Sequence, residues 1–236
     1  MRRAIGIIAA TIAAAGIAGC GGGSDTTTGG TTDTGAPPAT TAASTTATSP
    51  AETGAPVSNS TCSTPTDATT EGPYYVTGTA ELTDGNLNYD DLPGDTIAIA
   101  GYVYSGTAKN TPLANAIVDV WQTDDSGAYW PESNGPASGY TAEQLSLRGH
   151  VVTDARGYYR FTTVYPGEYE GRARHIHIRA ASADSSKDVV TQLIMSKEGD
   201  QTPATADNIA RSLPECHTMR FSTLDGVATA FFDFHL

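Results

Sequence analysis

Aromatic residues are confined to one part of this chain, which limits where a hydrophobic core can form. All of them lie between Cys62 and Leu236, whereas residues 21–60 contain 12 threonines, no aromatic residue and neither Lys nor Arg. A segment of that composition buries too little apolar surface to fold. We therefore expect residues 20–61 to be a disordered low-complexity linker and residues 62–236 to form a single domain.

The N-terminus carries the features of an export signal. Arg2-Arg3 precedes an apolar stretch, residues 4–18, which is too short to span a bilayer but suits the core of a signal peptide. The end of this stretch, Ile17-Ala18-Gly19-Cys20, resembles a bacterial lipobox. The resemblance implies that residues 1–19 are removed and that Cys20 is lipidated, so that the mature chain is anchored to a membrane and faces the periplasm or the cell exterior. The alternative is an ordinary secretory peptide with an incidental cysteine.

The two remaining cysteines form an even pair. With Cys20 assigned to the anchor, Cys62 and Cys216 are left in an exported and therefore oxidising setting. We expect a disulfide between them, and two separate buried thiols are the alternative.

The charge balance excludes one class of function. Lys and Arg number 13 against 26 Asp and Glu, a formal net charge of −13. This balance offers no basic surface for nucleic acid and would repel anionic lipid headgroups. We expect no nucleic-acid partner, and membrane contact only through the lipid anchor.

Alternation of apolar and polar residues dominates the domain and predicts an all-β fold. Turn sequences such as Asp84-Gly85 and Pro93-Gly94 separate the alternating segments. This pattern is typical of a β-sandwich. The expected strands are residues 97–104, 116–121, 158–163, 174–179, 189–195 and 227–235. Residues 203–213 form the one helical candidate, a connection.

One of the expected strands carries a candidate metal site. In residues 174–178 the alternation places His175 and His177 on one face, so both imidazoles can chelate one ion. A polar strand facing solvent is the alternative. No cysteine or carboxylate shares that face, so a structural zinc site is not indicated. Tyr129 and Tyr169 are the informative neighbours in sequence, because phenolate ligands suit a hard, highly charged ion such as Fe(III).

Several separated motifs then resemble those of a known family, the intradiol ring-cleavage dioxygenases that act on catechol-type compounds. The order and spacing of these motifs across residues 62–236 make the resemblance specific. The first motifs are Glu71-Gly72-Pro73-Tyr74-Tyr75, and Val118-Asp119-Val120-Trp121-Gln122 with Gly127-Ala128-Tyr129. Three further pieces together resemble a hairpin of the family: Leu147-Arg148-Gly149, Thr153-Asp154 and Gly157-Tyr158-Tyr159-Arg160-Phe161. The last motifs are Pro166-Gly167-Glu168-Tyr169, Arg172-Ala173-Arg174-His175-Ile176-His177, and Thr191-Gln192.

The resemblance implies an iron centre and a reaction. Tyr129, Tyr169, His175 and His177 would ligate a non-haem Fe(III), with solvent hydroxide completing the shell. Tyr129 and His175 would be equatorial and the other two axial, and Tyr169 would leave when a catechol binds. O₂ would then be inserted between the two hydroxylated ring carbons to give a muconate-type diacid.

The resemblance also implies roles for two further residues. Arg172 matches the family arginine that stabilises negative charge developing on the bound ring, and Gln192 resembles its hydrogen-bonding companion. A surface charge and an ordinary strand residue are the respective alternatives, and the orientation of Arg174 stays open. The acidic composition favours catechol or hydroxyquinol over carboxylated rings.

Two other functions compete with this hypothesis. One is a lipid-anchored, non-catalytic β-sandwich for binding or adhesion that retains a relic metal site. The other is a zinc or copper hydrolase built on His175 and His177, which lacks a third histidine or a carboxylate at motif spacing. We expect Trp121 to be a core residue, and His150, His217 and His235 to be structural or exposed.

Overall fold

A computed structural model describes residue 62, residues 65–107 and residues 111–236. The expected signal peptide, the lipidated Cys20 and the whole of the expected linker lie outside the described residues. Within them the chain forms strands and short 3-10 helices, and none of these helices is long and apolar enough to span a membrane. The strands are β1 Val76–Thr77, β2 Thr96–Tyr104, β3 Ile117–Trp121, β4 Gly135–Pro136, β5 Arg148–Val152, β6 Tyr158–Val164, β7 His175–Ala181, β8 Asp188–Ile194, β9 Ser222–Leu224, β10 Val227–Phe231 and β11 Phe234–His235, and the 3-10 helices are η1 Ala137–Gly139, η2 Ala142–Gln144, η3 Ala210–Ser212 and η4 Glu215–His217.

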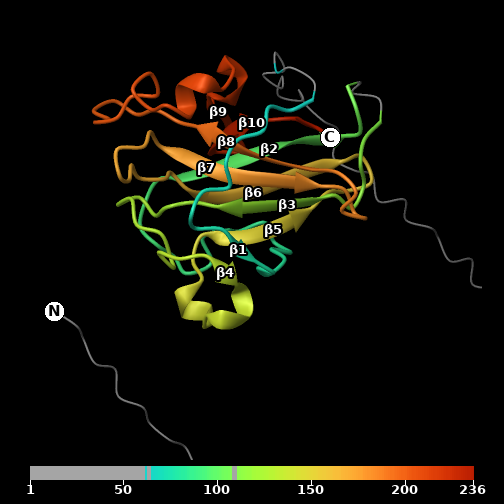
Figure 1. Cartoon of the computed structure of the whole chain (residues 1–236), viewed down its shortest axis with the longest axis horizontal. Helices are drawn as coiled ribbons and strands as arrows, with labels where there is room; N and C mark the ends of the chain where they lie inside the picture. Colours follow the sequence, from blue (N-terminus) through green and yellow to red (C-terminus); the bar gives the residue numbers. More distant parts are fainter. Residues whose placement is uncertain (1–61, 63–64, 108–110) are drawn as a thin grey trace, which may run out of the picture. The chain divides into compact units, whose positions relative to one another are not determined.

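Two sheets pack face to face, as the sequence predicts (Figure 1). One is antiparallel with the order β5-β3-β7-β8, which we call the histidine sheet because β7 carries both histidines of the candidate site. In the other, β2 pairs with β6 on one side and with β10 and β11 on the other, and β9 pairs with β10. Apolar side chains from both sheets, such as Ile176 and Ile178 from β7 and Ile99 from β2, share one core.

Two local expectations are wrong. The segments expected to form a hairpin do not pair with each other, because β5 pairs with β3 while β6 pairs with β2 in the opposite sheet. Residues 203–213 do not form the expected helix and contain only the short turn η3. The carboxylate of Asp207 accepts the backbone N–H groups of Ile209 and Ala210 at 2.8 and 3.1 Å, as at the N-terminus of a helix, so helical turns start no earlier than Asp207. Leu213, which precedes Pro214, is already extended, so only one short turn fits between them.

A segment near the start of the domain covers the outer face of the histidine sheet. We call residues 65–77 the strap. The Thr69 N–H donates to the carbonyl of Val190 on β8, and the Gln192 side chain donates to the carbonyl of Thr70. Figure 1 shows this cyan segment running across the strands towards β1. Because of the strap, both faces of β7 are buried.

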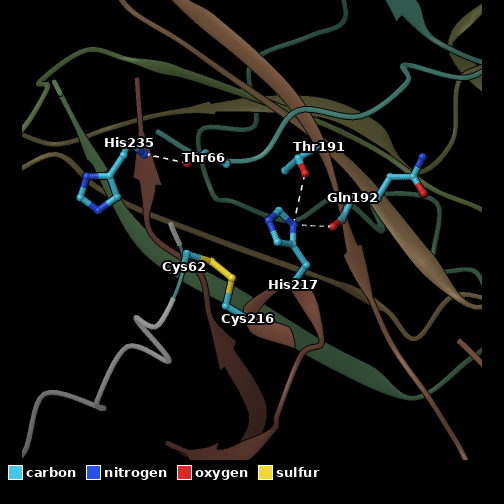
Figure 2. The surroundings of a disulfide bond; sticks show 7 residues. All are labelled: Cys62, Thr66, Thr191, Gln192, Cys216, His217 and His235. Atoms are coloured by element: carbon cyan, nitrogen blue, oxygen red, sulfur yellow. Dashed lines mark hydrogen bonds between the residues drawn. A yellow bond between two sulfur atoms is a disulfide. The ribbon is translucent and has the colours of Figure 1, made fainter. Parts of the chain in front are cut away.

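The predicted disulfide between Cys62 and Cys216 is present and lies close to the start of the strap (Figure 2). Next to it, the hydroxyl oxygen of Thr66 accepts a hydrogen bond of 2.8 Å from the backbone N–H of His235 on β11. His217 is fully buried there, and its Nδ1 lies 3.1 Å from the carbonyl oxygen of Gln192. The first and last segments of the domain are therefore held together by a covalent bond and by hydrogen bonds.

We expect a Cys62→Ser/Cys216→Ser variant to lose up to about 5 kcal/mol of unfolding free energy, because the disulfide closes a loop of 154 residues in the unfolded chain. Urea denaturation of both proteins, with and without a reductant, provides the measurement. Reductant should destabilise the natural chain and leave the variant unchanged. Equal stability of the two oxidised proteins would contradict this account.

Candidate metal centre

The two histidines of β7 direct their ring nitrogens at each other. Alternation places Ile176 and Ile178 in the core, so His175 and His177 share the opposite face and are 2% and 1% exposed. His175 Nδ1 lies 2.6 Å from the carbonyl oxygen of Ala173, which fixes the proton on Nδ1 and leaves a lone pair on Nε2. The two Nε2 atoms are 3.2 Å apart. Two nitrogen ligands on adjacent positions of one ion, each about 2.1 Å from it, have roughly this separation.

Burial and nearby cations keep both imidazoles neutral. Burial, reinforced by the positive charge of Arg172, lowers the pKa of His175 to about 4. Burial, together with His175 and Arg172, lowers the pKa of His177 well below its usual value. A neutral imidazole is the form that binds a metal ion.

The turn after β3 positions Tyr129. The carboxylate of Asp124 accepts the backbone N–H groups of Ser126 and Ala128 at 2.9 and 3.0 Å, and it also accepts the indole N–H of Trp130 at 3.0 Å. These bonds fix the chain on both sides of Tyr129. Its ring is 4% exposed, and its hydroxyl is buried without a hydrogen-bond partner among the described residues.

A tight turn positions Tyr169. Glu170 and Gly171 both have positive φ angles, 48° and 71°, and the Arg172 N–H donates to the carbonyl of Tyr169 at 2.8 Å. This is the geometry of a two-residue hairpin turn, in which the residues before and after the turn lie opposite each other. Tyr169 and Arg172 are therefore held side by side. Tyr169 and the turn that follows it also line a surface pocket of about 350 Å³.

Close backbone packing joins these two tyrosine-bearing segments. The Gly167 N–H donates to the carbonyl of Asp124 at 2.7 Å, and the Thr123 hydroxyl donates to the carbonyl of Gly167 at 3.0 Å. A Cβ atom at Gly127, whose φ is 91°, would overlap the carbonyl oxygen of Glu168. Glycine is thus required for the approach of the two segments.

The four predicted ligands lie next to one another. Ring centroids are 5.1 Å apart for Tyr129 and Tyr169, 5.4 Å for Tyr169 and His175, and 4.8 Å for His175 and His177. Burial raises the pKa of both phenols, most strongly that of Tyr129. The donor set fits a hard trivalent ion, because two neutral imidazoles converge and an unpartnered buried phenol lies beside them.

The two predicted auxiliary residues are in contact. Arg172 donates from Nη2 to Gln192 Oε1 at 2.8 Å and from Nε to the buried carboxylate of Asp207 at 2.7 Å. Arg174 instead pairs with Asp200 and donates to the carbonyl of Pro166. Of these two arginines, Arg172 is the one whose charge acts on the histidines.

The strap contributes residues to which the sequence patterns assigned no firm role. Gly72 lies against His177, since a Cβ atom there would be 3.1 Å from the imidazole Cε1. Tyr74 stacks on Tyr129 with centroids 4.4 Å apart and donates its hydroxyl to Glu170. The predicted core residue Trp121 is buried and stacks on His177 at 5.0 Å. Asp207 contacts Arg172, and Arg148 lies over the ring of Tyr129. Both contacts join segments that are separated in the sequence.

A second group of metal-binding atom types lies at the disulfide. One ligand atom from each of Cys62, Cys216 and His217 falls within 4.8 Å of the others. Metal ions bind cysteine as thiolate, and here the two sulfur atoms are bonded to each other.

His150 is half-buried on β5 and His235 is buried on β11, and neither joins the group around His175.

Comparison with protein families gives one model, described as Dioxygenase, that matches residues 70–234. The chain is similar to catechol 1,2-dioxygenase 2 of Acinetobacter lwoffii, with 32% identity over 186 residues, 70% of this chain and 58% of the relative. It is also similar to hydroxyquinol 1,2-dioxygenase of Rhodococcus opacus, with 28% identity over 67% of this chain and 57% of the relative. The chain thus spans little more than half the length of these curated relatives.

Among solved structures, the fold resembles the dioxygenase domain of a dioxygenase carbohydrate-binding protein fusion from Streptomyces sp. SirexAA-E. The TM-score is 0.57 and the identity 29%, and the match covers 73% of this chain and 97% of that domain.

We expect Gly127→Ala to cost about 2–3 kcal/mol of unfolding free energy, because the new Cβ atom forces apart the segments that carry Tyr129 and Tyr169. Thermal denaturation provides the measurement. Gly139→Ala is the matched control, since a Cβ atom there has no neighbour within 4 Å. Equal melting temperatures for the two variants would show that the close approach is not required.

We expect the metal-free chain to lose stability as pH falls below about 6.5. The unfolded chain then takes up protons at His175 and His177, whereas in the folded chain the pKa of His175 is lowered to about 4 and that of His177 lies well below its usual value. Above pH 6.5 this contribution to stability is fully present. Urea denaturation between about pH 7 and pH 5 measures the slope, above the range of most carboxylates.

The His175→Gln variant should have a smaller slope over this range, because it lacks one of the two imidazoles whose pKa values folding lowers. An unchanged slope in His175→Gln would contradict the assignment.

Proposed function

The chain belongs to the intradiol ring-cleavage dioxygenase family, and on that basis we propose that it is an Fe(III)-dependent enzyme that cleaves catechol-type diols. With O₂, the ring would open between the two hydroxylated carbons to give a muconate-type diacid. The observation that carries this proposal is the meeting of two neutral imidazoles, 3.2 Å apart at Nε2, with two phenols in one buried cluster.

Tyr129, Tyr169, His175 and His177 are the residues that would hold the iron. When bound, Fe(III) supplies a Lewis acid that favours phenolate and catecholate and draws electron density from the diol ring. The histidines need no deprotonation, because burial already keeps them neutral. Both phenols must lose a proton, since their pKa values are raised.

The two phenols differ in a way that assigns them different tasks. Tyr129 is buried and fixed by the Asp124 turn, whereas Tyr169 is half-buried. Tyr169 is therefore the more accessible phenol. We assign it the role of the ligand that the diol would displace, and its phenolate oxygen would accept a substrate proton.

Arg172 supplies a fixed cation for negative charge on the ring. Asp207 and Gln192 hold two different nitrogens of its guanidinium, so the fork is oriented before substrate binds. A preoriented cation stabilises charge that develops during reaction. Gln192 is itself held by the strap through the carbonyl of Thr70.

We also propose that the enzyme is exported and lipid-anchored through Cys20, with O₂ and small neutral diols as its reaction partners. The disulfide between Cys62 and Cys216 supports an oxidising compartment. The acidic net charge of −13 and the carboxylate of Glu170 beside Tyr74 favour uncharged rings such as catechol or hydroxyquinol.

The test is oxygen uptake by the iron-loaded protein with a panel of catechols, followed by product spectra that separate intradiol from extradiol cleavage. We expect a coloured protein with a phenolate-to-iron absorption band, and muconate-type products. Tyr129→Phe should fold, lose activity and bleach most of the band. A colourless protein that binds no iron and consumes no oxygen would instead support a non-catalytic binding module.

We expect Arg172→Ala to lower turnover by about 10²–10³ with a much smaller change in KM, because the cation acts on charge that develops after the diol binds. Steady-state kinetics and iron analysis give the measurement. Arg174→Ala is the control, since this arginine pairs with Asp200 away from Gln192, and it should keep near-native turnover. The reverse result would assign the catalytic cation to Arg174.

A further inference from the structure

Arg148 is the most deeply buried arginine near the candidate centre. It begins β5, lies opposite Trp121 of β3 and is 2% exposed. Its guanidinium donates from Nε to the carbonyl of Trp130 at 2.8 Å and from Nη2 to the carbonyl of Pro131 at 2.9 Å. Nη1 donates to the carbonyl of Tyr74 in the strap. Arg148 thus joins the strap to the loop that follows Tyr129.

The charge of Arg148 has no anionic partner among the described residues. Other arginines near the site have one: Arg172 pairs with Asp207, Arg174 with Asp200 and Arg179 with Asp188. Burial lowers the pKa of Arg148 to about 10, so it stays a cation at neutral pH. Carbonyl dipoles satisfy its N–H groups but leave its net charge unbalanced, and such a buried charge is costly.

Three phenols act on the charge of Arg148, and that of Tyr129 acts most strongly, ahead of Tyr140 and Tyr89. The guanidinium carbon lies 5.4 Å from the centre of the Tyr129 ring. In the proposed function Tyr129 is a phenolate when metal is bound and a neutral phenol when it is not. The arginine charge is therefore balanced only in the metal-loaded protein.

We propose that Arg148 is a positioning residue that supplies the counter-charge of the Tyr129 phenolate and so favours the metal-loaded state. The inference rests on the proposed function and goes beyond it, because it assigns metal retention to a residue that touches neither the ion nor the substrate. Its hydrogen bonds fix the cation over the ring by joining β5, the strap and the Trp130–Pro131 loop.

Two substitutions separate charge from hydrogen bonding. Arg148→Gln keeps amide donors for the carbonyls and removes the charge, whereas Arg148→Lys keeps the charge with fewer donors. Arg179→Met is the control, since the charge of Arg179 is already paired with Asp188 on the same sheet. Near-ultraviolet circular dichroism of the metal-free proteins first establishes folding.

The readouts are the position of the phenolate-to-iron absorption band and Fe(III) affinity by chelator competition. A nearby cation stabilises the phenolate more than the neutral radical formed on charge transfer, so its loss lowers the transition energy. We expect Arg148→Gln to move the band to longer wavelength and to bind Fe(III) about 10–100-fold more weakly. Arg148→Lys and Arg179→Met should stay close to the natural protein in band position.

The opposing results are distinct. The proposal fails if the band and the Fe(III) affinity of Arg148→Gln are unchanged. It also fails if the Gln and Lys variants show equal shifts, or if neither variant folds. In each case Arg148 would have only a structural role through its hydrogen bonds. The proposal states that the charge of Arg148 destabilises the metal-free protein. It would therefore also be overturned if metal-free Arg148→Lys folded and metal-free Arg148→Gln did not. A natural protein that shows no iron-phenolate band would instead defeat the proposed function, and this inference with it.

Discussion

The arrangement of the site depends on one close backbone contact, between Gly127 and the Gly167–Glu168 peptide. The first belongs to the turn after β3 in the histidine sheet, and the second follows β6 in the opposite sheet. With no side chain at either glycine, a backbone hydrogen bond between the turns can form directly. The contact therefore joins the two sheets at the point where Tyr129 and Tyr169 emerge, and the spacing of the phenols follows from backbone packing rather than from side-chain adjustment.

Two cationic arginines, Arg148 and Arg172, act on the candidate ligands. Arg148 and Arg172 both act on His177, which burial and its neighbours hold neutral. The four predicted metal ligands carry no charge while they bind no ion. Such surroundings favour whatever brings negative charge into the cluster, which includes phenolates and a deprotonated diol. The net charge of −13 predicts an acidic surface, whereas the charges of Arg148 and Arg172 near the candidate ligands are positive.

Strand periodicity made much of the fold predictable, because local alternation reports directly on which face is buried. It located β2, β3, β6, β7 and β8 and placed both histidines on one face. Pairing was less accessible: the expected β5–β6 hairpin failed because the chain crosses between sheets there. The helix expected at residues 203–213 is reduced to η3, because Asp207 caps a turn in its middle and Leu213, before Pro214, is extended. Roles such as those of Gly72 and Arg148 come from contacts between segments far apart in sequence, which no local pattern encodes.

The attachment of the strap also orders events during folding. Residues 65–77 come first in the domain, yet their neighbours include Cys216 and His235 near its end, through the disulfide at Cys62 and the bond at Thr66. Contacts of such sequence separation form late, since the intervening chain must be arranged first. The disulfide and the bond at Thr66 therefore fix the start of the strap only once the C-terminal segment has joined the domain, whereas the bonds from Thr69 and Thr70 to β8 need no residue beyond Gln192.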